Sequence, residues 1–110
     1  MTPAPEDAKL VTLARAARAR TSAHQGAAVR DRDGRTYAAS TVSLPSWSVD
    51  ALDLAVAMAI SSGATGVEAG AVVGDPDRLV HLEVLRDFAG DDVVVHLADP
   101  TGQVVGVKRT

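Results

Sequence analysis

The chain has 110 residues, of which 46% are hydrophobic and 23% charged, with a formal net charge of -3 and no cysteine. This length predicts a single domain, residues 1–110, and the average composition excludes a wholly disordered chain. The negative charge argues against a nucleic-acid partner, and the lack of cysteine excludes disulfides and thiolate-bound zinc. No stretch reaches the roughly 18 apolar residues of a membrane span, and the acidic start is unlike a signal peptide, so we expect a cytoplasmic protein without a membrane partner.

The hydrophobic pattern predicts three helices and five strands. Apolar side chains at helical spacing predict helices over 8–20, 49–62 and 75–88. Runs of small and β-branched residues predict strands over 25–31, 35–42, 67–73, 92–97 and 103–108. The order α-β-β-α-β-α-β-β opens on a hairpin and continues with strand-helix units, which predicts an α/β fold with a mixed sheet covered by helices.

Turn and cap residues mark three of the boundaries. The Asp33-Gly34 pair predicts a tight hairpin turn, because glycine tolerates positive φ. Ser48 is the predicted N-cap of the second helix. Asp75-Pro76 predicts the start of the third helix, since proline has no N–H group to leave unpaired in a first turn.

The second predicted helix, 49–62, is apolar around most of its circumference. Only Asp50, Asp53 and Ser61 form a narrow polar edge. We expect nearly all of this helix to be buried, partly against a neighbouring subunit, which predicts a homo-oligomer, either a dimer or a tetramer. Packing against the other two helices alone is the alternative.

Four blocks of sequence carry a family resemblance: 26–29 (GAAV), 33–35 (DGR), 41–42 (TV) and 84–88 (VLRDF). Together they resemble the framework of the small zinc-dependent cytidine deaminases. The resemblance implies a three-layer sandwich, with a mixed five-stranded sheet between layers of helices. Small members of the family assemble as dimers or tetramers around the region of the second helix, which supports the oligomer prediction.

The same resemblance implies where the zinc site of the family stands in this chain. Leu52 occupies the position of the first zinc ligand and Leu54 that of the catalytic glutamate, while Arg78 and His81 occupy those of the paired cysteines. Leucine offers no donor atom and arginine stays protonated, so three of the four positions cannot perform this chemistry. We therefore expect no catalytic residue, no bound metal and no other cofactor.

The substrate contacts implied by the resemblance differ as well. Ala23 stands where the family has an aromatic residue that packs on the pyrimidine, and Thr41 and Ser43 stand in the motif that contacts ribose. Trp47 stands where the family often has an aromatic residue, just before the second helix, and we expect it to anchor packing or an interface. These four residues are the predicted remnants of the substrate pocket.

His81 is the one residue at an implied ligand position that can still bind a metal. A helical wheel places it within an apolar arc, so we expect a core histidine that is hydrogen-bonded inside the protein. A new metal site is the alternative, with further donors to be drawn from His24, His96, Asp50 and Asp53.

Arg78 and the two leucines suggest how the vacated site is filled. The guanidinium of Arg78 can replace part of the metal's charge by pairing with Asp50 or Asp53. A solvated arginine is the alternative. Leu52 and Leu54 are expected to fill the cavity, because an empty apolar void is costly.

Three functions follow from these observations. We favour a catalytically inactive cytidine deaminase-like protein, a pseudoenzyme that serves as an oligomeric interaction or regulatory module. The first alternative is a non-catalytic binder of a nucleoside or a small anion at the remnant site, using the helix N-termini as donors. The second is an active nucleoside deaminase with non-standard ligands.

Overall fold

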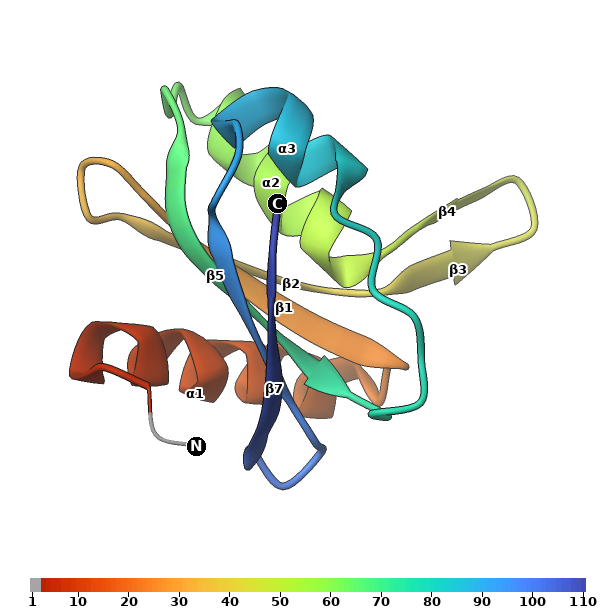
Figure 1. Ribbon diagram of the computed structural model, residues 1–110. Coiled ribbons are helices and arrows are strands. Elements are labelled where there is room, and N and C mark those ends of the chain that lie inside the picture. Colours follow the sequence, from red (N-terminus) through yellow and green to blue (C-terminus); the bar gives the residue numbers. More distant parts are fainter. Residues whose placement is uncertain (1–2) are drawn as a thin grey trace.

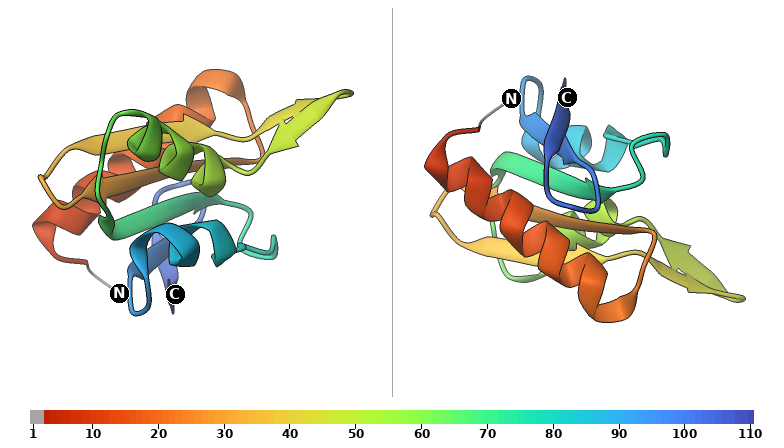
Figure 2. Two further views of the ribbon diagram at one scale, coloured as in Figure 1. Left: turned by 90° about the horizontal axis from the view of Figure 1, so that it is seen from above. Right: turned by 90° about the horizontal axis from the view of Figure 1, so that it is seen from below.

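The computed structural model describes residues 3–110, which build a mixed five-stranded sheet between two layers of helices (Figure 1). The helices are α1 (Pro5–Thr21), α2 (Ala51–Ser61) and α3 (Glu83–Ala89). The strands are β1 (Gln25–Asp31), β2 (Thr36–Ser40), β3 (Val42–Leu44), β4 (Trp47–Val49), β5 (Val67–Gly74), β6 (Val94–Ala98) and β7 (Val104–Arg109). Helix α1 covers one face of the sheet, and α2 and α3 cover the other (Figure 2). The predicted three-layer α/β fold is confirmed.

The strands of the main sheet follow the order β2-β1-β5-β6-β7. Strand β1 pairs with both β2 and β5 in antiparallel fashion, and β6 pairs with β7 in the same way. Strands β5 and β6 are parallel, with Ala71 opposite His96. A parallel pair needs a crossover connection, and the segment that contains α3 provides it.

Small residues bring α1 unusually close to the sheet. Ala14 and Ala17 are buried on the inner side of the helix, above the alanines of β1 and β5. A Cβ atom placed on Gly26 would lie 2.0 Å from the carbonyl oxygen of Ala14, well inside van der Waals contact. Gly26 is therefore required at the point where the helix crosses β1.

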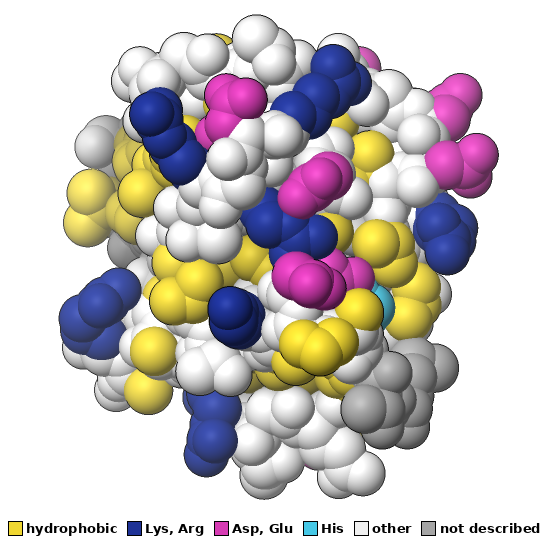
Figure 3. Space-filling model, turned by 90° about the vertical axis from the view of Figure 1, so that its left-hand side faces the viewer, with side chains coloured by type: hydrophobic (Ala, Val, Ile, Leu, Met, Phe, Trp, Pro, Cys, Tyr) yellow, Lys and Arg dark blue, Asp and Glu magenta, His cyan; other side chains and the backbone are white. Residues whose placement is uncertain are grey.

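A partly buried cluster of charges joins the first turn of α1 to the sheet. The carboxylate of Asp7 accepts hydrogen bonds from Arg30 Nη2 at 2.9 Å and pairs with His96 Nε2 at 2.8 Å. Arg30 also donates through Nε to Glu68. Figure 3 shows acidic, basic and histidine side chains gathered at the centre of this face, among hydrophobic ones. The cluster ties together α1, β1, β5 and β6.

The prediction of a helix from Asp75 was wrong, because α3 begins only at Glu83. The carboxylate of Asp75 accepts the N–H of Asp77, and the N–H of Arg78 donates to the carbonyl of Asp75, which closes one isolated turn. Residues 79–82 then form neither helix nor strand, and we call residues 75–82, which cross from β5 to α3, the extended segment. Packing of Val80 against the core and a hydrogen bond from Lys108 Nζ to the Val80 carbonyl hold it in that conformation.

A second hairpin, which was not predicted, precedes α2. Strands β3 and β4 form a separate two-stranded sheet that stands out from the body of the molecule (Figures 1 and 2). The predicted strand 35–42 therefore divides into β2 and β3 at Thr41. Ser48 is paired with Ser43 inside the hairpin, and Asp50 is the residue that precedes the first turn of α2, so the predicted cap at Ser48 was wrong.

Helix α2 is buried where it faces the sheet, and some of its other apolar side chains are exposed in the single chain, so the expected burial of nearly the whole helix also needs the predicted neighbouring subunit. Leu52 and Val56 are at most 2% exposed and face the sheet. Met58 and Ile60 are 39% and 47% exposed. The sheet and the short helix α3 leave these two side chains of α2 uncovered. Within residues 3–110, no helix combines the length and the apolar character needed to cross a lipid bilayer.

We predict that Asp7 makes stability sensitive to acid. Burial by itself raises the pKa of Asp7, but the hydrogen bonds from His96 and Arg30 outweigh it and hold the pKa below its usual value. A carboxyl group with a lowered folded pKa stabilises the protein above its unfolded pKa of about 3.9, and this contribution is lost as the pH falls through the folded pKa. Asp7→Asn should therefore cost about 2 kcal/mol at pH 7 and much less near pH 3.

The measurement is urea unfolding of both proteins at the two pH values. Asp87→Asn serves as the control, because Asp87 is exposed on α3. An equal cost of Asp7→Asn at both pH values would contradict the assigned role of the carboxylate.

Candidate functional site

The implied zinc site lies at the start of α2, where the structure places packing side chains. Leu52 is 2% exposed and belongs to the hydrophobic core between the sheet and the two shorter helices. Its Cδ1 atom lies 3.8 Å from the point where a Cβ would stand on Gly70 of β5, so the side chain is directed onto the sheet. Leu54 is half-buried and packs against the same core.

The other two implied ligand positions lie on the extended segment that precedes α3. Arg78 and His81 are both exposed. The expected interior position of His81 was wrong, because the chain is not helical there and a helical wheel does not apply. Val80 and Leu82, on either side of His81, turn toward the core instead.

Polar side chains from four segments surround a pocket of about 430 Å³, which we call the polar pocket. Its lining consists of His24, Thr41, Val42, Ser43, Ser48, Val49, Asp50, Asp53 and Arg78. Two of the predicted remnant positions, Thr41 and Ser43, lie in this lining, whereas Ala23 and Trp47 do not. Ala23 is half-buried after α1, and Trp47 is 54% exposed on the projecting hairpin.

Two carboxylates shape the electrostatics of the polar pocket. Burial raises the pKa of Asp53, and the neighbouring charge of Asp50 raises it further, while His81 acts in the opposite direction. Arg78 shares the pocket with both aspartates. Within residues 3–110, however, no ion pair within 4.0 Å joins Arg78 to either of them, so the predicted pairing is not formed.

The residues at this site do not fit the zinc ion that the resemblance implies. A catalytic zinc needs three protein donors that converge on one point. In the part of the chain that the structure describes, no group of three or more histidine, aspartate or glutamate side chains is placed to hold a metal ion. The implied ligand Leu52 has no donor atom and is directed into the core.

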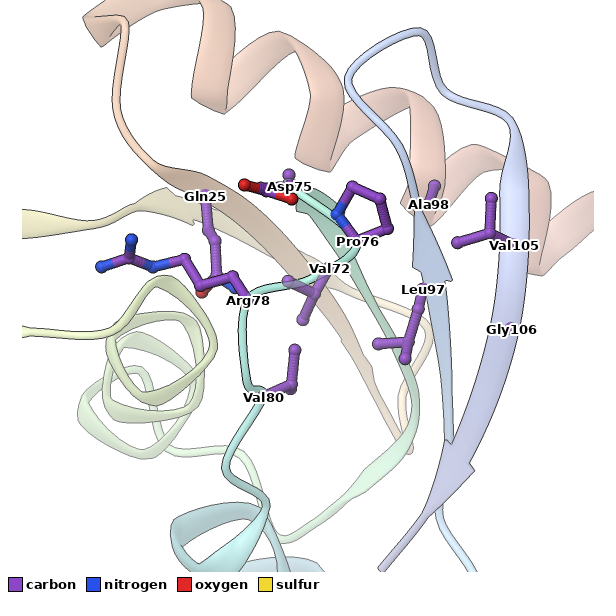
Figure 4. A pocket seen from close by; sticks show the side chains of 11 residues that line it. Gln25, Val72, Asp75, Pro76, Arg78, Val80, Leu97, Ala98, Val105 and Gly106 are labelled. Carbon is purple, nitrogen blue, oxygen red and sulfur yellow. The ribbon is translucent and has the colours of Figure 1, made fainter.

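A second pocket, of about 270 Å³, lies between the extended segment and strands β6 and β7 (Figure 4). We call it the apolar pocket. Its lining includes Val72, Val80, Leu97 and Val105, with Gln25, Asp75 and Arg78 as its polar members. Sequence reasoning missed it because a helix was expected from Asp75. The signal available in the sequence was Gln25, a polar residue that directly precedes the small and apolar run 26–29 of its strand.

Comparisons with known proteins agree with this fold. Residues 3–102 match the sequence model of the cytidine deaminase-like family. The cytidine deaminase from Burkholderia pseudomallei is similar in structure, with a TM-score of 0.73 and 23% identity over 93% of this chain and 89% of that one. The cytidine deaminase from Mycobacterium leprae is also similar in structure, with a TM-score of 0.70 and 22% identity over 92% of this chain and 90% of that one. No curated protein matches the sequence. At these identities, the structural likeness establishes the fold.

We predict that Leu52 contributes to stability as a core residue does. Truncating a leucine with 2% exposure removes its packing and leaves a cavity, so Leu52→Ala should lower the free energy of unfolding by about 3 kcal/mol. The matched control is Leu79→Ala, because Leu79 is 67% exposed. Its cost should stay within about 0.5 kcal/mol. Urea unfolding measures both, and equal costs would mean that Leu52 is not packed as described.

Proposed function

The chain belongs to the cytidine deaminase-like family, and from that premise we propose that it is a catalytically inactive member that serves as an oligomeric interaction or regulatory module. The observation that carries this proposal is the position of Leu52, at 2% exposure in the hydrophobic core. By resemblance, this is the position of the first zinc ligand. A metal ligand has been exchanged there for a side chain that holds the sheet and α2 together.

The chemistry of the family explains why this exchange matters. Zinc deaminases use the metal to activate a water molecule, and a glutamate beside the metal transfers protons to and from the base. Leu54, at the position of that glutamate, has no ionisable group. Arg78, at the position of a cysteine, is exposed on an extended segment and cannot donate an electron pair to a metal. At these positions the chain therefore has neither ligands for a metal that activates water nor a carboxylate that transfers protons.

We expect the purified protein to contain no stoichiometric zinc and to release no ammonia from cytidine. Elemental analysis and a coupled ammonia assay measure the two quantities, with a zinc-loaded family enzyme as the positive control. Stoichiometric zinc together with turnover would overturn the proposal in favour of an active deaminase with non-standard ligands. Loss of that turnover in Asp53→Asn would then assign the catalytic carboxyl group.

The oligomeric part of the proposal rests on two exposed apolar surfaces. Met58 and Ile60 are exposed on opposite flanks of the buried face of α2. On the projecting hairpin, Leu44 and Trp47 face each other across the two strands and are 57% and 54% exposed. An isolated two-stranded hairpin is marginally stable in water, so contact with a second subunit would stabilise it. Both surfaces belong to one continuous stretch of chain, from residue 42 to residue 61.

We predict a concentration-dependent homo-oligomer that Ile60→Glu disrupts. A buried glutamate at a subunit interface must lose its hydration, so the mutant should be monomeric at concentrations where the original protein is assembled. Sedimentation velocity measures the size distribution. Trp47 is the single tryptophan of the chain, so its fluorescence reports directly on this hairpin, and we expect a blue shift on assembly.

The matched control for this experiment is Leu79→Glu, which adds the same charge at a 67% exposed position outside the proposed interface. It should leave the assembly intact. A protein that stays monomeric at all concentrations, or an Ile60→Glu variant that assembles normally, would contradict the proposed interface.

The size and polarity of the polar pocket favour a second candidate function. About 430 Å³ lined by hydroxyl groups, two carboxylates and Arg78 is large enough for a small polar molecule. The second candidate is therefore a non-catalytic nucleoside binder at this site. The carboxylates of Asp50 and Asp53 favour a neutral ligand with hydroxyl groups over an anion. A rise in melting temperature with a nucleoside, absent in Asp50→Asn, would support this function.

A further inference from the structure

The apolar pocket lies outside the implied deaminase site. Val72, Leu97 and Val105 on three strands of the sheet line it, and the extended segment borders it with Pro76 and Val80 (Figure 4). Only Arg78 belongs to both pockets. The volume of about 270 Å³ is too small for a polypeptide and suits a molecule of about ten non-hydrogen atoms.

Gln25 brings a polar side chain to the wall of this pocket. The residue is 5% exposed, and its backbone N–H and carbonyl are both engaged by Thr41. Its side-chain amide makes no hydrogen bond to another residue within 3–110, and it lines the pocket. The amide atoms are not among the buried side-chain atoms that lack a partner, so they are accessible from the cavity and a ligand there can hydrogen-bond to them.

The pocket is divided into a charged end and an aliphatic end. In Figure 4, Gln25, Asp75 and Arg78 stand on one side, and Leu97, Ala98 and Val105 stand on the other. The charged end carries one carboxylate and one guanidinium, so it complements a ligand head with one positive and one negative group. The aliphatic end contains no aromatic ring, which suits a branched aliphatic chain more than a flat heterocycle.

Both charged groups are available to a ligand. One oxygen of Asp75 accepts the N–H of Asp77, which leaves the second oxygen free. Arg78 is exposed and forms no ion pair within 4.0 Å among residues 3–110. A guanidinium binds a carboxylate through two parallel hydrogen bonds, and a carboxylate accepts hydrogen bonds from an ammonium group.

We propose that the apolar pocket binds a free α-amino acid with a branched aliphatic side chain. The side chain lies among Val72, Leu97 and Val105, the ammonium group faces Asp75, and the carboxylate faces Arg78 and the amide of Gln25. This site is independent of the proposed loss of catalysis, because it uses none of the residues at the start of α2.

The test is isothermal titration calorimetry of the full chain with L-leucine and three analogues. Isovalerate lacks the ammonium group, isoamylamine lacks the carboxylate, and glycine lacks the side chain. L-leucine should bind in a one-to-one ratio, and each analogue should bind about tenfold more weakly or not at all, as expected for the loss of one charge-assisted hydrogen bond or of the aliphatic contact. The side-chain amide signals of Gln25 in NMR spectra should shift on addition of L-leucine.

Variants assign the binding to this pocket. Val105→Trp places a large side chain in the cavity and should abolish binding, whereas Val107→Trp is the matched control on the same edge strand, at 39% exposure, and should bind L-leucine normally. Asp75→Asn should weaken L-leucine about tenfold and leave isovalerate unchanged, while Arg78→Gln should weaken both.

Three results would overturn the proposal: no heat with L-leucine, binding that survives Val105→Trp, or isovalerate binding as tightly as L-leucine. The last result would replace the zwitterion with a simple aliphatic carboxylate. None of these outcomes bears on zinc content or cytidine turnover, so failure here is distinguishable from failure of the proposed function.

Discussion

The close contact between α1 and β1 is the constraint on which the rest of the structure depends. A methyl group on Gly26 would overlap the helix backbone, with 2.0 Å between its carbon and the carbonyl oxygen of Ala14. Such an approach is possible only because alanines line both surfaces, and it fixes the helix across β1 and β5. Asp7 is thereby held over Arg30 and His96, so that a packing constraint determines where the charge cluster forms.

The opposite face of the sheet is organised by larger side chains, and this difference bears on function. Leu52, Val56 and Leu85 fill the space between the sheet and the two short helices. In an enzyme of this family, part of that region must hold a metal and exclude packing side chains. In this chain Leu52 belongs to the hydrophobic core, at the position that the resemblance assigns to a metal ligand. Under the proposed function, stability and catalysis place opposite demands on this one residue.

The sequence predicts the strands and the layer order well, because β-branched runs and the Asp33-Gly34 turn are local signals. It fails where the deciding contacts are distant. Asp75 and Pro76 carry the local signature of a helix start, yet the chain forms a single turn there and Val80 packs against the core. The pair of Asp7 and His96 joins positions 89 residues apart, which no spacing rule detects. The β3–β4 hairpin has strands of three residues each, too short for an alternating pattern to emerge.

The extended segment before α3 contributes residues to both pockets. A helix from residue 75 would draw the chain into regular turns and cover the ends of β5 and β6. The chain is not helical there, and residues from this segment line a pocket toward the start of α2 and another toward strand β7. Arg78 lies on the boundary and lines both. A guanidinium that pairs with a ligand carboxylate in the apolar pocket is drawn away from Asp50 and Asp53, so one side chain links the electrostatics of the two sites.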